Sequence, residues 1–354
     1  MSKRVLITPL DWGLGHATRC VPIIQELIEL KCEVLLAGAG PSLSFLRKEF
    51  PSLKYVSLPG YDPAYPSSGS LMFALALQAA RFVKIVLREQ NQVKRIINEY
   101  QIDAVISDNR YGCFSKKVPC VFITHQLTLL ASPGWGWLGV LANFVTNQLI
   151  SKFSLCWVPD FSGSILTGKL SDTKKKKVIF IGPLSRFKEP EVINEMTYDV
   201  LALLSGPESQ RSVLEELVTR QLGELGLKAL IVRGVIGQSD ERTLNNIKIV
   251  NHLETDLLQQ AILQSRLILS RSGYSTIMDL ARLCKKAIFI PTPGQTEQEY
   301  LAKRFTKLGV SYSADQNSFS LREAIAESEK FTGFRDYNFN GSLNQTLKEF
   351  LAKC

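Results

Sequence analysis

The sequence contains no C-x-x-C pair, and its 7 cysteines are odd in number and dispersed along the chain. A disulfide framework needs an even set of cysteines, and a structural zinc site needs closely spaced ligand pairs. We therefore expect neither, and this cysteine usage is typical of a protein in a reducing cytoplasm.

A long hydrophobic run is also missing. Residues 1–4 lead directly into Val5-Leu6-Ile7, a segment far too short for a signal-peptide core or for a membrane span of ~20 residues. The least charged stretch, residues 118–151, has no Asp, Glu, Lys or Arg, but polar residues interrupt it throughout. We expect neither a signal peptide nor a transmembrane helix, and we expect a cytoplasmic location.

The composition shows little bias. Hydrophobic residues make up 45% of the chain and charged residues 21%, which excludes disordered, collagenous and fibrous proteins. A length of 354 residues favours about two domains of ~150 residues each. The 42 Lys+Arg against 33 Asp+Glu give a net charge of +9. Such a mildly basic surface suits phosphates, nucleotides or anionic lipid, and we expect no nucleic-acid partner.

Short apolar β-rich runs alternate with amphipathic helical patterns, which is typical of parallel sheets covered by helices on both faces. The fold class is therefore α/β, with two doubly wound Rossmann-like domains. The strands expected in the first half span residues 4–10, 33–38, 54–58, 103–108 and 120–125, and the helices 18–30 and 70–100. The strands expected in the second half span 178–181, 200–204, 229–233, 247–251, 267–270 and 287–291, and the helices 212–222, 254–265, 274–283 and 297–307.

The polar segment 159–177 ends in four lysines and has the composition of an exposed linker. It separates an N-terminal domain, residues 1–158, from a C-terminal domain, residues 178–335. A C-terminal helix within 336–354 is expected to pack back on the N-terminal domain. Open α/β sheets bind ligands at the carboxyl ends of their strands, so the cleft between two such domains is where we expect the chemistry.

The first candidate site follows the first strand, where Gly13 and Gly15 precede His16. A glycine-rich turn lets backbone N–H groups approach an anion, although a simple tight turn gives the same pattern. His16 has an ordinary pKa suited to a general base. Asp108 ends another strand and can orient that imidazole, unless it only forms a turn with Asn109. Asp11 and His125 are the alternative bases and the candidates on the acceptor side.

The densest candidate site lies in the second half. Small and hydroxylated residues follow the strand at 267–270 and open a helix, where they can donate hydrogen bonds to a diphosphate, although N-capping is the alternative role. Asp279 can accept from ribose hydroxyls, and the amides and carboxylate after 287–291 suit a sugar. His252 and Leu253 follow the strand at 247–251, and a structural hydrogen bond is the alternative role for His252. The candidates for nucleotide-sugar binding here are His252, Leu253, Arg271, Ser272, Gly273, Tyr274, Ser275, Thr276, Asp279, Gly294, Gln295, Glu297 and Gln298.

These motifs resemble those of GT-B-fold glycosyltransferases over nearly the whole chain. They are most similar to glycosyltransferase family 28, which includes the lipid-linked N-acetylglucosaminyltransferase of peptidoglycan synthesis. The resemblance rests on Gly13-Leu14-Gly15-His16 with Pro22, on residues 181–186, on residues 206–210 and on Ser270-Arg271-Ser272-Gly273 with Asp279. It implies that Arg186, Ser209 and Gln210 contact the nucleotide, together with Gly13 and Gly15. Glu297-Gln298-Glu299 departs from the family's donor-sugar motif and is similar to the acid–Gln pair of plant and antibiotic sugar transferases.

The resemblance implies transfer of a sugar from a nucleoside-diphosphate sugar, UDP-linked, to an acceptor hydroxyl, with inversion and without a metal ion or cofactor. No Asp-x-Asp motif is present, which agrees with metal-independent transfer. The alternatives are a nucleotide-sugar epimerase and a non-catalytic nucleotide-sugar binding protein. Apolar segments at 71–87 and 135–150 suggest a lipid-linked acceptor of a cell-envelope glycoconjugate and peripheral contact with the inner membrane face, although buried core helices give the same pattern.

Overall fold

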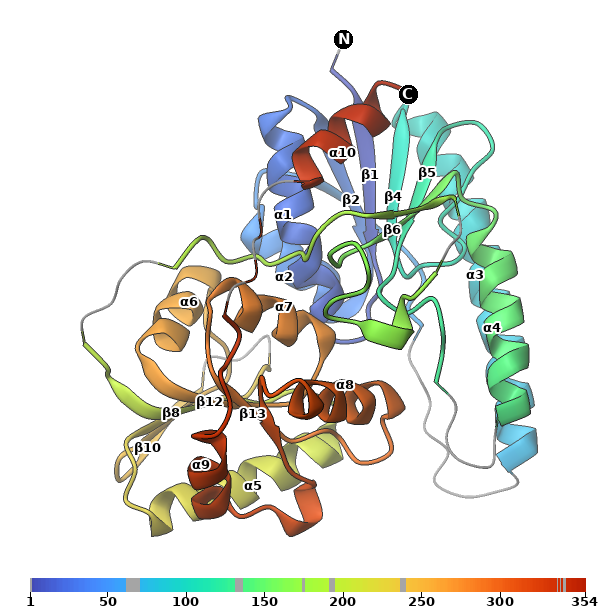
Figure 1. Cartoon of the computed structure of the whole chain (residues 1–354). Coiled ribbons are helices and arrows are strands. Elements are labelled where there is room, and N and C mark those ends of the chain that lie inside the picture. Colours follow the sequence, from blue (N-terminus) through green and yellow to red (C-terminus); the bar gives the residue numbers. More distant parts are fainter. Residues whose placement is uncertain are drawn as a thin grey trace. The chain divides into compact units, whose positions relative to one another are not determined.

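The computed structural model describes residues 2–61, 71–130, 136–173, 176–190, 195–235, 240–335, 337, 339 and 342–354 (Figure 1). The chain divides into two compact units. The first unit comprises Met1–Leu129, Trp137–Leu184 and Asn340–Cys354, and the second comprises Leu130–Gly136 and Ser185–Phe339. Trp135 of the expected apolar segment, and Lys174 and Lys175 of the expected linker, lie outside the described residues.

The first unit is built on a seven-stranded parallel sheet with the order β3-β2-β1-β4-β5-β6-β7. Its strands are β1 (Arg4–Pro9), β2 (Glu33–Gly38), β3 (Lys54–Ser57), β4 (Ala104–Asp108), β5 (Cys120–Ile123), β6 (Leu155–Val158) and β7 (Val178–Phe180). Its helices are α1 (Gly15–Glu29), α2 (Gly40–Glu49), α3 (Leu71–Glu99), α4 (Gly136–Ile150) and α10 (Ser342–Leu351), with the short η1 (Gly168–Leu170).

The central strands of this sheet are hydrophobic along their whole length because both faces are covered. Every residue of β4 and β5 is buried, and the buried face of α1 includes Ile23, Ile24 and Leu27. Trp157 of β6 is also fully buried. Continuous apolar strands of this kind are expected for a parallel sheet between helix layers, as the sequence pattern predicted.

The second unit is built on a seven-stranded sheet with the order β10-β11-β9-β8-β12-β13-β14. Its strands are β8 (Tyr198–Leu203), β9 (Ala229–Val232), β10 (Glu241–Leu244), β11 (Ile247–Val250), β12 (Ser265–Ser270), β13 (Ala287–Phe289) and β14 (Tyr312–Ser313). Its helices are α5 (Glu208–Glu224), α6 (Thr255–Leu263), α7 (Tyr274–Arg282), α8 (Thr296–Lys307) and α9 (Leu321–Ser328), with the short η2 (Gln316–Ser318). Among the described strands of this unit, only β10 is antiparallel, and a two-residue turn with Asn245 at φ 52° joins it to β11.

The expected linker at 159–177 is wrong. The segment Val178–Phe180 pairs with β6 as the edge strand of the first sheet, so the first unit extends to Leu184. The preceding loop is also packed, because the buried carboxylate of Asp160 accepts hydrogen bonds from the backbone N–H groups of Leu166 and Thr167 at 3.0 and 2.8 Å. The polar composition of this segment indicated an exposed loop, but it could not show that the loop folds around the buried carboxylate of Asp160.

The C-terminal helix α10 packs on the first unit. Asn344 Nδ2 donates to Glu26 Oε2 of α1 at 2.6 Å, and the ring of Phe350 lies edge-on to Trp157 at 5.4 Å. Lys3 Nζ donates to the carbonyl of Cys354 at 2.5 Å, so the two ends of the chain lie together (Figure 1). Both contacts of α10 are therefore made with elements of the N-terminal part of the sequence.

Candidate functional site

The loops that follow β1, β4 and β5 meet at one edge of the first sheet. These three strands are neighbours, and their register places Pro9 opposite Asp108 and Asp108 opposite Ile123. Strand order reverses at β1, since β2 lies on one side of it and β4 on the other. Doubly wound sheets bind ligands at this point, because the loops diverge there.

His16 and Asp108 contact each other at this edge. His16 Nδ1 lies 2.7 Å from Asp108 Oδ1, and the imidazole keeps 15% of its side-chain surface exposed while the carboxylate is fully buried. The helix was expected from Thr18 but begins at Gly15, which makes His16 its second residue. Asn109 adopts a left-handed φ of 55°, so the chain also turns directly after Asp108. The two interpretations of Asp108 therefore describe the same segment.

Arg19 completes this site, and the sequence analysis missed it. Its buried guanidinium donates to both carboxylate oxygens of Asp108 through Nε and one terminal nitrogen. The same terminal nitrogen lies 2.9 Å from His16 Nδ1, and the other lies 2.9 Å from His125 Nδ1. The available signal was the i, i+3 spacing of His16 and Arg19, which places both side chains on one face of a helix.

The charges of this cluster shift its proton equilibria. Burial first, and then the positive charge of Arg19, lower the pKa of His16 below its ordinary 6.5, although Asp108 opposes them. Burial alone would raise the pKa of Asp108, but Arg19 and His16 outweigh it and lower that pKa to about 2. His16 is therefore neutral and Asp108 ionised at neutral pH, which is the protonation state that a general base requires.

Asp11 lies in the same loop but is tied to the protein. Its Oδ2 accepts from the backbone N–H of Tyr61 at 2.9 Å, and its Oδ1 lies 3.7 Å from the buried guanidinium of Arg110. The side chain is only 6% exposed. Trp12, next in sequence, is 51% exposed and meets Tyr61 edge-on at 6.4 Å. This environment makes Asp11 a less accessible base than His16.

The loops that carry the candidates of the second half also meet at one edge. The register places Ser270 of β12 opposite both Leu203 of β8 and Phe289 of β13, and Val250 of β11 opposite Val232. Ser209 and Gln210 then lie in the first turn of α5, and His252 and Leu253 lie directly after β11. Gly273 is the N-cap of α7, whose first turn contains Tyr274, Ser275 and Thr276. Gly294, at φ 80°, precedes α8, whose N-cap is Gln295 and whose first turn contains Glu297 and Gln298.

Arg271 is buried and organises this edge rather than pointing out of it. Its terminal nitrogens donate to the carbonyls of Ile290, Pro291 and Gln210 at 3.0, 3.1 and 3.0 Å, and to Gln316 Oε1 at 2.6 Å. The guanidinium of Arg271, a residue that the sequence analysis assigned to nucleotide-sugar binding, thus makes these hydrogen bonds within the protein. The side chain joins the ends of β12 and β13 to α5, which fixes the loops beside it.

Side chains of α8 hold the loop after β13. Gln298 Oε1 accepts from the backbone N–H of Thr292 at 2.8 Å, and its carbonyl accepts from Ser272 Oγ at 2.7 Å. Glu299 Oε1 accepts from Gly294 N–H at 3.0 Å. Gln298, which the sequence analysis assigned to sugar binding, therefore also fixes the shape of its own loop, together with Glu299.

Asp279 lies in α7 and contacts the segment that enters the second unit. Ser185 Oγ donates to Asp279 Oδ1 at 2.6 Å, and the charge of Arg186 acts on the same carboxylate. Burial raises the pKa of Asp279 to about 6, even though Arg186 and the hydrogen bonds oppose it. Arg186 itself stacks over the ring of Phe187 at 5.1 Å. The acid and the arginine that the sequence assigned to one nucleotide site are thus brought together.

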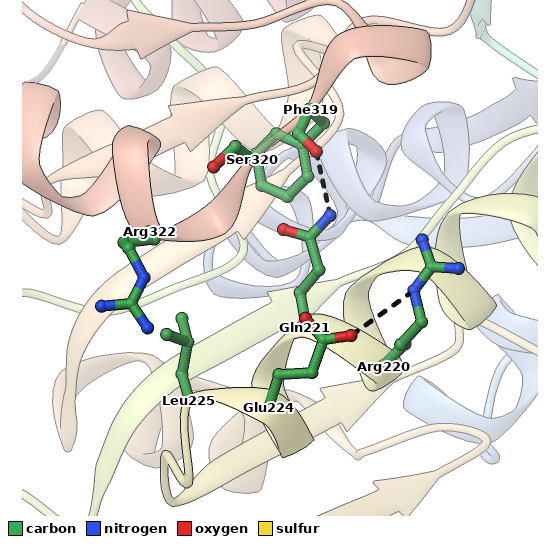
Figure 2. Close-up of a pocket in the computed structure, with 7 residues that line it drawn as sticks. All are labelled: Arg220, Gln221, Glu224, Leu225, Phe319, Ser320 and Arg322. Carbon is green, nitrogen blue, oxygen red and sulfur yellow. Dashed lines mark hydrogen bonds and ion pairs between the residues drawn. The ribbon is translucent and has the colours of Figure 1, made fainter.

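A separate cavity of about 410 Å³ lies between the C-terminal half of α5 and the start of α9. Figure 2 shows Gln221 directed at the carbonyl of Phe319, a hydrogen bond of 2.9 Å, and Arg220 paired with Glu224. Because α5 runs back from the carboxyl end of β8, its C-terminal half lies at the other edge of the sheet. The candidate residues do not line this cavity.

Two further observations concern metals and membranes. Within the described ranges, no group of three or more His, Cys, Asp or Glu is placed to hold a metal ion. Among the helices of the described residues, none is long and apolar enough to span a bilayer.

Comparison with known proteins gives a family match for the second half of the chain. Residues 201–349 match the model of the Glycosyltransferase family 28 C-terminal domain. One relative is the UDP-N-acetylglucosamine--N-acetylmuramyl-(pentapeptide) pyrophosphoryl-undecaprenol N-acetylglucosamine transferase of Clostridium tetani, 25% identical, with 91% of this chain and 88% of that protein aligned. Another is an uncharacterized glycosyltransferase of Methanopyrus kandleri, 23% identical, with 86% and 90% aligned.

Solved structures share the fold over the whole chain. The glycotransferase of kitacinnamycin superposes with a TM-score of 0.69 at 16% identity, over 99% of this chain and 100% of that one. MurG of Acinetobacter baumannii superposes with a TM-score of 0.61 at 15% identity, over 99% and 100%. The chain is a glycosyltransferase with the GT-B fold. Over residues 201–349 it is similar to glycosyltransferase family 28, as the motifs of the sequence predicted.

Proposed function

We propose that this enzyme transfers the sugar of a UDP-sugar to the hydroxyl of a lipid-linked acceptor, with inversion at the anomeric carbon and without a metal ion. The observation that carries the proposal is the 2.7 Å contact between His16 Nδ1 and Asp108 Oδ1 at the carboxyl edge of the first sheet. In this proposal the first unit binds the acceptor and the second unit binds the nucleotide sugar.

The reaction is a single displacement. His16 Nε2 takes the proton of the acceptor hydroxyl while the hydroxyl oxygen attacks the anomeric carbon. The bond from that carbon to the diphosphate oxygen breaks, and UDP leaves with the electron pair. Asp108 stabilises the imidazolium that forms. One displacement inverts the anomeric configuration.

The negative charge of the leaving diphosphate needs donors in the second unit. Arg186 supplies a permanent positive charge, and the N-terminus of α7 supplies backbone N–H groups aligned with the helix dipole. Ser275 and Thr276 add hydroxyl donors in the first turn. Asp279 accepts from the ribose hydroxyls in its ionised form. These groups perform in this proposal the charge neutralisation that a metal ion provides in other transferases.

Exposed apolar and cationic side chains on two helices of the first unit, α3 and α4, support a lipid-linked acceptor. The apolar residues Trp137, Val140, Leu141, Phe144 and Val145 of α4 are between 43% and 71% exposed, and no residue of this helix is buried. The alternative interpretation of residues 135–150, a buried core helix, is therefore wrong for the described part of this segment. Helix α3 carries the exposed cations Arg81, Lys84 and Arg88 together with exposed Val83 and Leu87. Apolar insertion and cationic attraction together give peripheral binding to anionic lipid, which would bring the enzyme to a membrane-embedded acceptor.

The first test is donor binding. Isothermal titration and thermal unfolding with UDP, UDP-N-acetylglucosamine, UDP-glucose, thymidine diphosphate and GDP-mannose should show stabilisation by a uridine ligand. A ligand at 100 times its dissociation constant stabilises by about 2.7 kcal/mol. Thymidine diphosphate belongs in the panel because a fold relative, a spinosyn rhamnosyltransferase, was solved with it. Failure of every nucleotide to bind would contradict the proposal.

The second test is turnover with a detergent-solubilised glycolipid acceptor. Transfer predicts free UDP only when the acceptor is present, and proton coupling constants of the product report its anomeric configuration. A nucleotide-linked product formed without acceptor would indicate an epimerase. Binding without turnover of any donor and acceptor pair would indicate a binding protein. Chelation of divalent cations should leave turnover unchanged.

A further inference from the structure

Arg19 lies between the two histidines of the first unit, and its hydrogen bonds distinguish them. Its guanidinium contacts Asp108, His16 and His125 within one buried cluster. We propose that Arg19 is a positioning residue and that, together with Asp108, it gives His16 and His125 opposite tautomers and therefore opposite roles. His16 carries its proton on Nδ1 and presents a basic Nε2, whereas His125 carries its proton on Nε2 and acts as a hydrogen-bond donor. The role of His16 as base rests on the proposed function, but the tautomers do not.

The tautomer of His125 follows from the donor inventory. A guanidinium has five N–H donors and no acceptor. Arg19 Nη1 lies 2.9 Å from His125 Nδ1, so that histidine nitrogen must use its lone pair to accept the bond. A neutral imidazole has one proton, which then lies on Nε2. His125 is thereby removed as a general base, because one nitrogen accepts from Arg19 and the other is protonated.

The tautomer of His16 follows from its second neighbour. Asp108 Oδ1 lies 2.7 Å from His16 Nδ1 and, in an ionised carboxylate, can only accept. An unprotonated Nδ1 would set two lone pairs against each other at that distance. The nearby terminal nitrogen of Arg19 already donates to the same oxygen, so two donors share one acceptor. Nδ1 therefore carries the proton, and Nε2 keeps the lone pair that a base needs.

The charge of Arg19 also decides how strongly His16 holds a second proton. With His16 neutral, the charges of Arg19 and Asp108 cancel. A protonated His16 adds a positive charge 2.9 Å from a guanidinium in a buried site. This repulsion, after burial, lowers the pKa of His16. Among the described residues, the other ionisable groups that contact the cluster are His125 and Cys20, and Cys20 Sγ lies 3.9 Å from Asp108 Oδ2. Compared with a simple His–Asp pair, Arg19 keeps the base unprotonated at lower pH and favours release of the proton after transfer.

The tautomers can be measured without any substrate. The chain has only 3 histidines, so ¹⁵N-histidine labelling gives three sets of long-range ¹H–¹⁵N correlations. His252→Gln and His125→Gln assign them, and His252 of the second unit serves as the internal reference. In the ligand-free wild type at about pH 8, we expect the Nδ1–H pattern for His16 and the Nε2–H pattern for His125. An Nε2–H pattern for His16, or an Nδ1–H pattern for His125, would overturn the proposal.

Variants then test whether the charge of Arg19 lowers the pKa of His16. Arg19→Gln removes the charge and should raise the pKa of His16 relative to wild type, whereas Arg19→Lys keeps the charge and should leave it low. Arg4→Gln is the matched control, because Arg4 is a partly exposed arginine on the same sheet, and it should change nothing. A folded Arg19→Gln protein with an unchanged His16 pKa would refute the role of Arg19. If that variant fails to fold, the wild-type tautomers alone decide. A failed transferase assay would leave these spectra unaffected, so the two proposals fail separately.

Discussion

The carboxylate of Asp108 lies 2.7 Å from Nδ1 of His16, although 92 positions separate these residues in the sequence. Two structural facts produce the contact. The register of β1 and β4 sets Asp108 opposite Pro9, and α1 begins at Gly15, shortly after β1 ends. The contact therefore depends on a parallel strand pair and on a short loop.

The first prediction concerns the base. His16→Ala should lower kcat by about 10²- to 10⁴-fold, because proton abstraction from the acceptor is lost. The dissociation constant of the donor should stay near the wild-type value, because the proposed donor site is in the other unit. Isothermal titration together with steady-state kinetics separates these effects. A weakened donor would instead indicate that His16 contacts the diphosphate, and an unchanged kcat would move the search to Asp108.

The second prediction concerns the stability of the buried cluster. Asp108→Asn leaves the guanidinium of Arg19 buried without its counter-charge, so we expect a loss of about 3–5 kcal/mol in the free energy of unfolding at neutral pH. Urea denaturation of both proteins measures it. Asp199→Asn is the control, since Asp199 is 40% exposed and lies 4.0 Å from Arg266. Equal stabilities for Asp108→Asn and wild type would show that Arg19 does not depend on this carboxylate.

We also expect the stability difference between wild type and Asp108→Asn to depend on pH. The pKa of Asp108 is about 2 in the folded state against an ordinary 3.8. A lowered carboxyl pKa contributes stability that is complete above the ordinary value and is lost as pH falls through the folded value. The difference in stability between wild type and Asp108→Asn should therefore narrow as the pH falls from about 4 toward about 2. A constant difference over this range would contradict the assignment.

The third prediction concerns donor binding. The pKa of Asp279 is raised to about 6, so the carboxylate that accepts from the ribose becomes protonated as the pH falls through that value. The donor should bind several-fold more weakly below it, and Asp279→Asn should bind weakly at every pH. Titration calorimetry across this range tests both expectations. An identical pH dependence in the variant would assign the effect to another group.

Asp279 also predicts a change in stability without ligand. Its folded pKa lies above the ordinary 3.8, so the folded state binds the proton more tightly and loses stability as the pH rises from 3.8 to about 6. Asp279→Asn removes this cost, and the ligand-free variant should be at least as stable as wild type at neutral pH. Thermal unfolding measures it, and a large destabilisation would indicate that the ionised carboxylate holds α7 in place.

The fourth prediction concerns the membrane. The double substitution Val140→Ser and Phe144→Ser removes two exposed apolar side chains from α4 and should weaken binding to vesicles with anionic lipid by tenfold or more, roughly 1.5–3 kcal/mol for each large side chain. Vesicle sedimentation measures the partition. Leu257→Ser is the control, because Leu257 is 53% exposed but belongs to the second unit. Wild-type partition of the double variant would exclude α4 from the contact, and wild-type thermal stability would show that the loss is not unfolding.

Much of the fold could be predicted from local pattern. The apolar strands at β1, β4 and β12 lie within two residues of their expected ends, because a strand buried on both faces must be hydrophobic along its length. The candidates after β1, β4, β12 and β13 follow from the same pattern, since every parallel strand in one sheet ends at the same edge. The candidates after β8, Ser209 and Gln210, came only from the family resemblance. Helix α4 shows the limit of the method. An uncharged apolar helix reads alike whether it is buried or exposed, and only its surroundings decide.

Local pattern was enough to predict the α/β fold class, because strand and helix periodicity and the glycine-rich junctions are local properties of the chain, whereas the glycosyltransferase class came from the resemblance of its motifs to a known family. Only the tertiary structure showed which strand belongs to which sheet and which charged side chains contact His16 and His125. Val178–Phe180 can pair with either sheet by composition, and its partner is fixed by long-range hydrogen bonds to β6. In the sequence Arg19 is an ordinary helical arginine. In the structure, the ends of β4 and β5 place Asp108 and His125 against its guanidinium. Buried charge pairs depend on contacts between distant segments, and such contacts exist only once the sheet has formed.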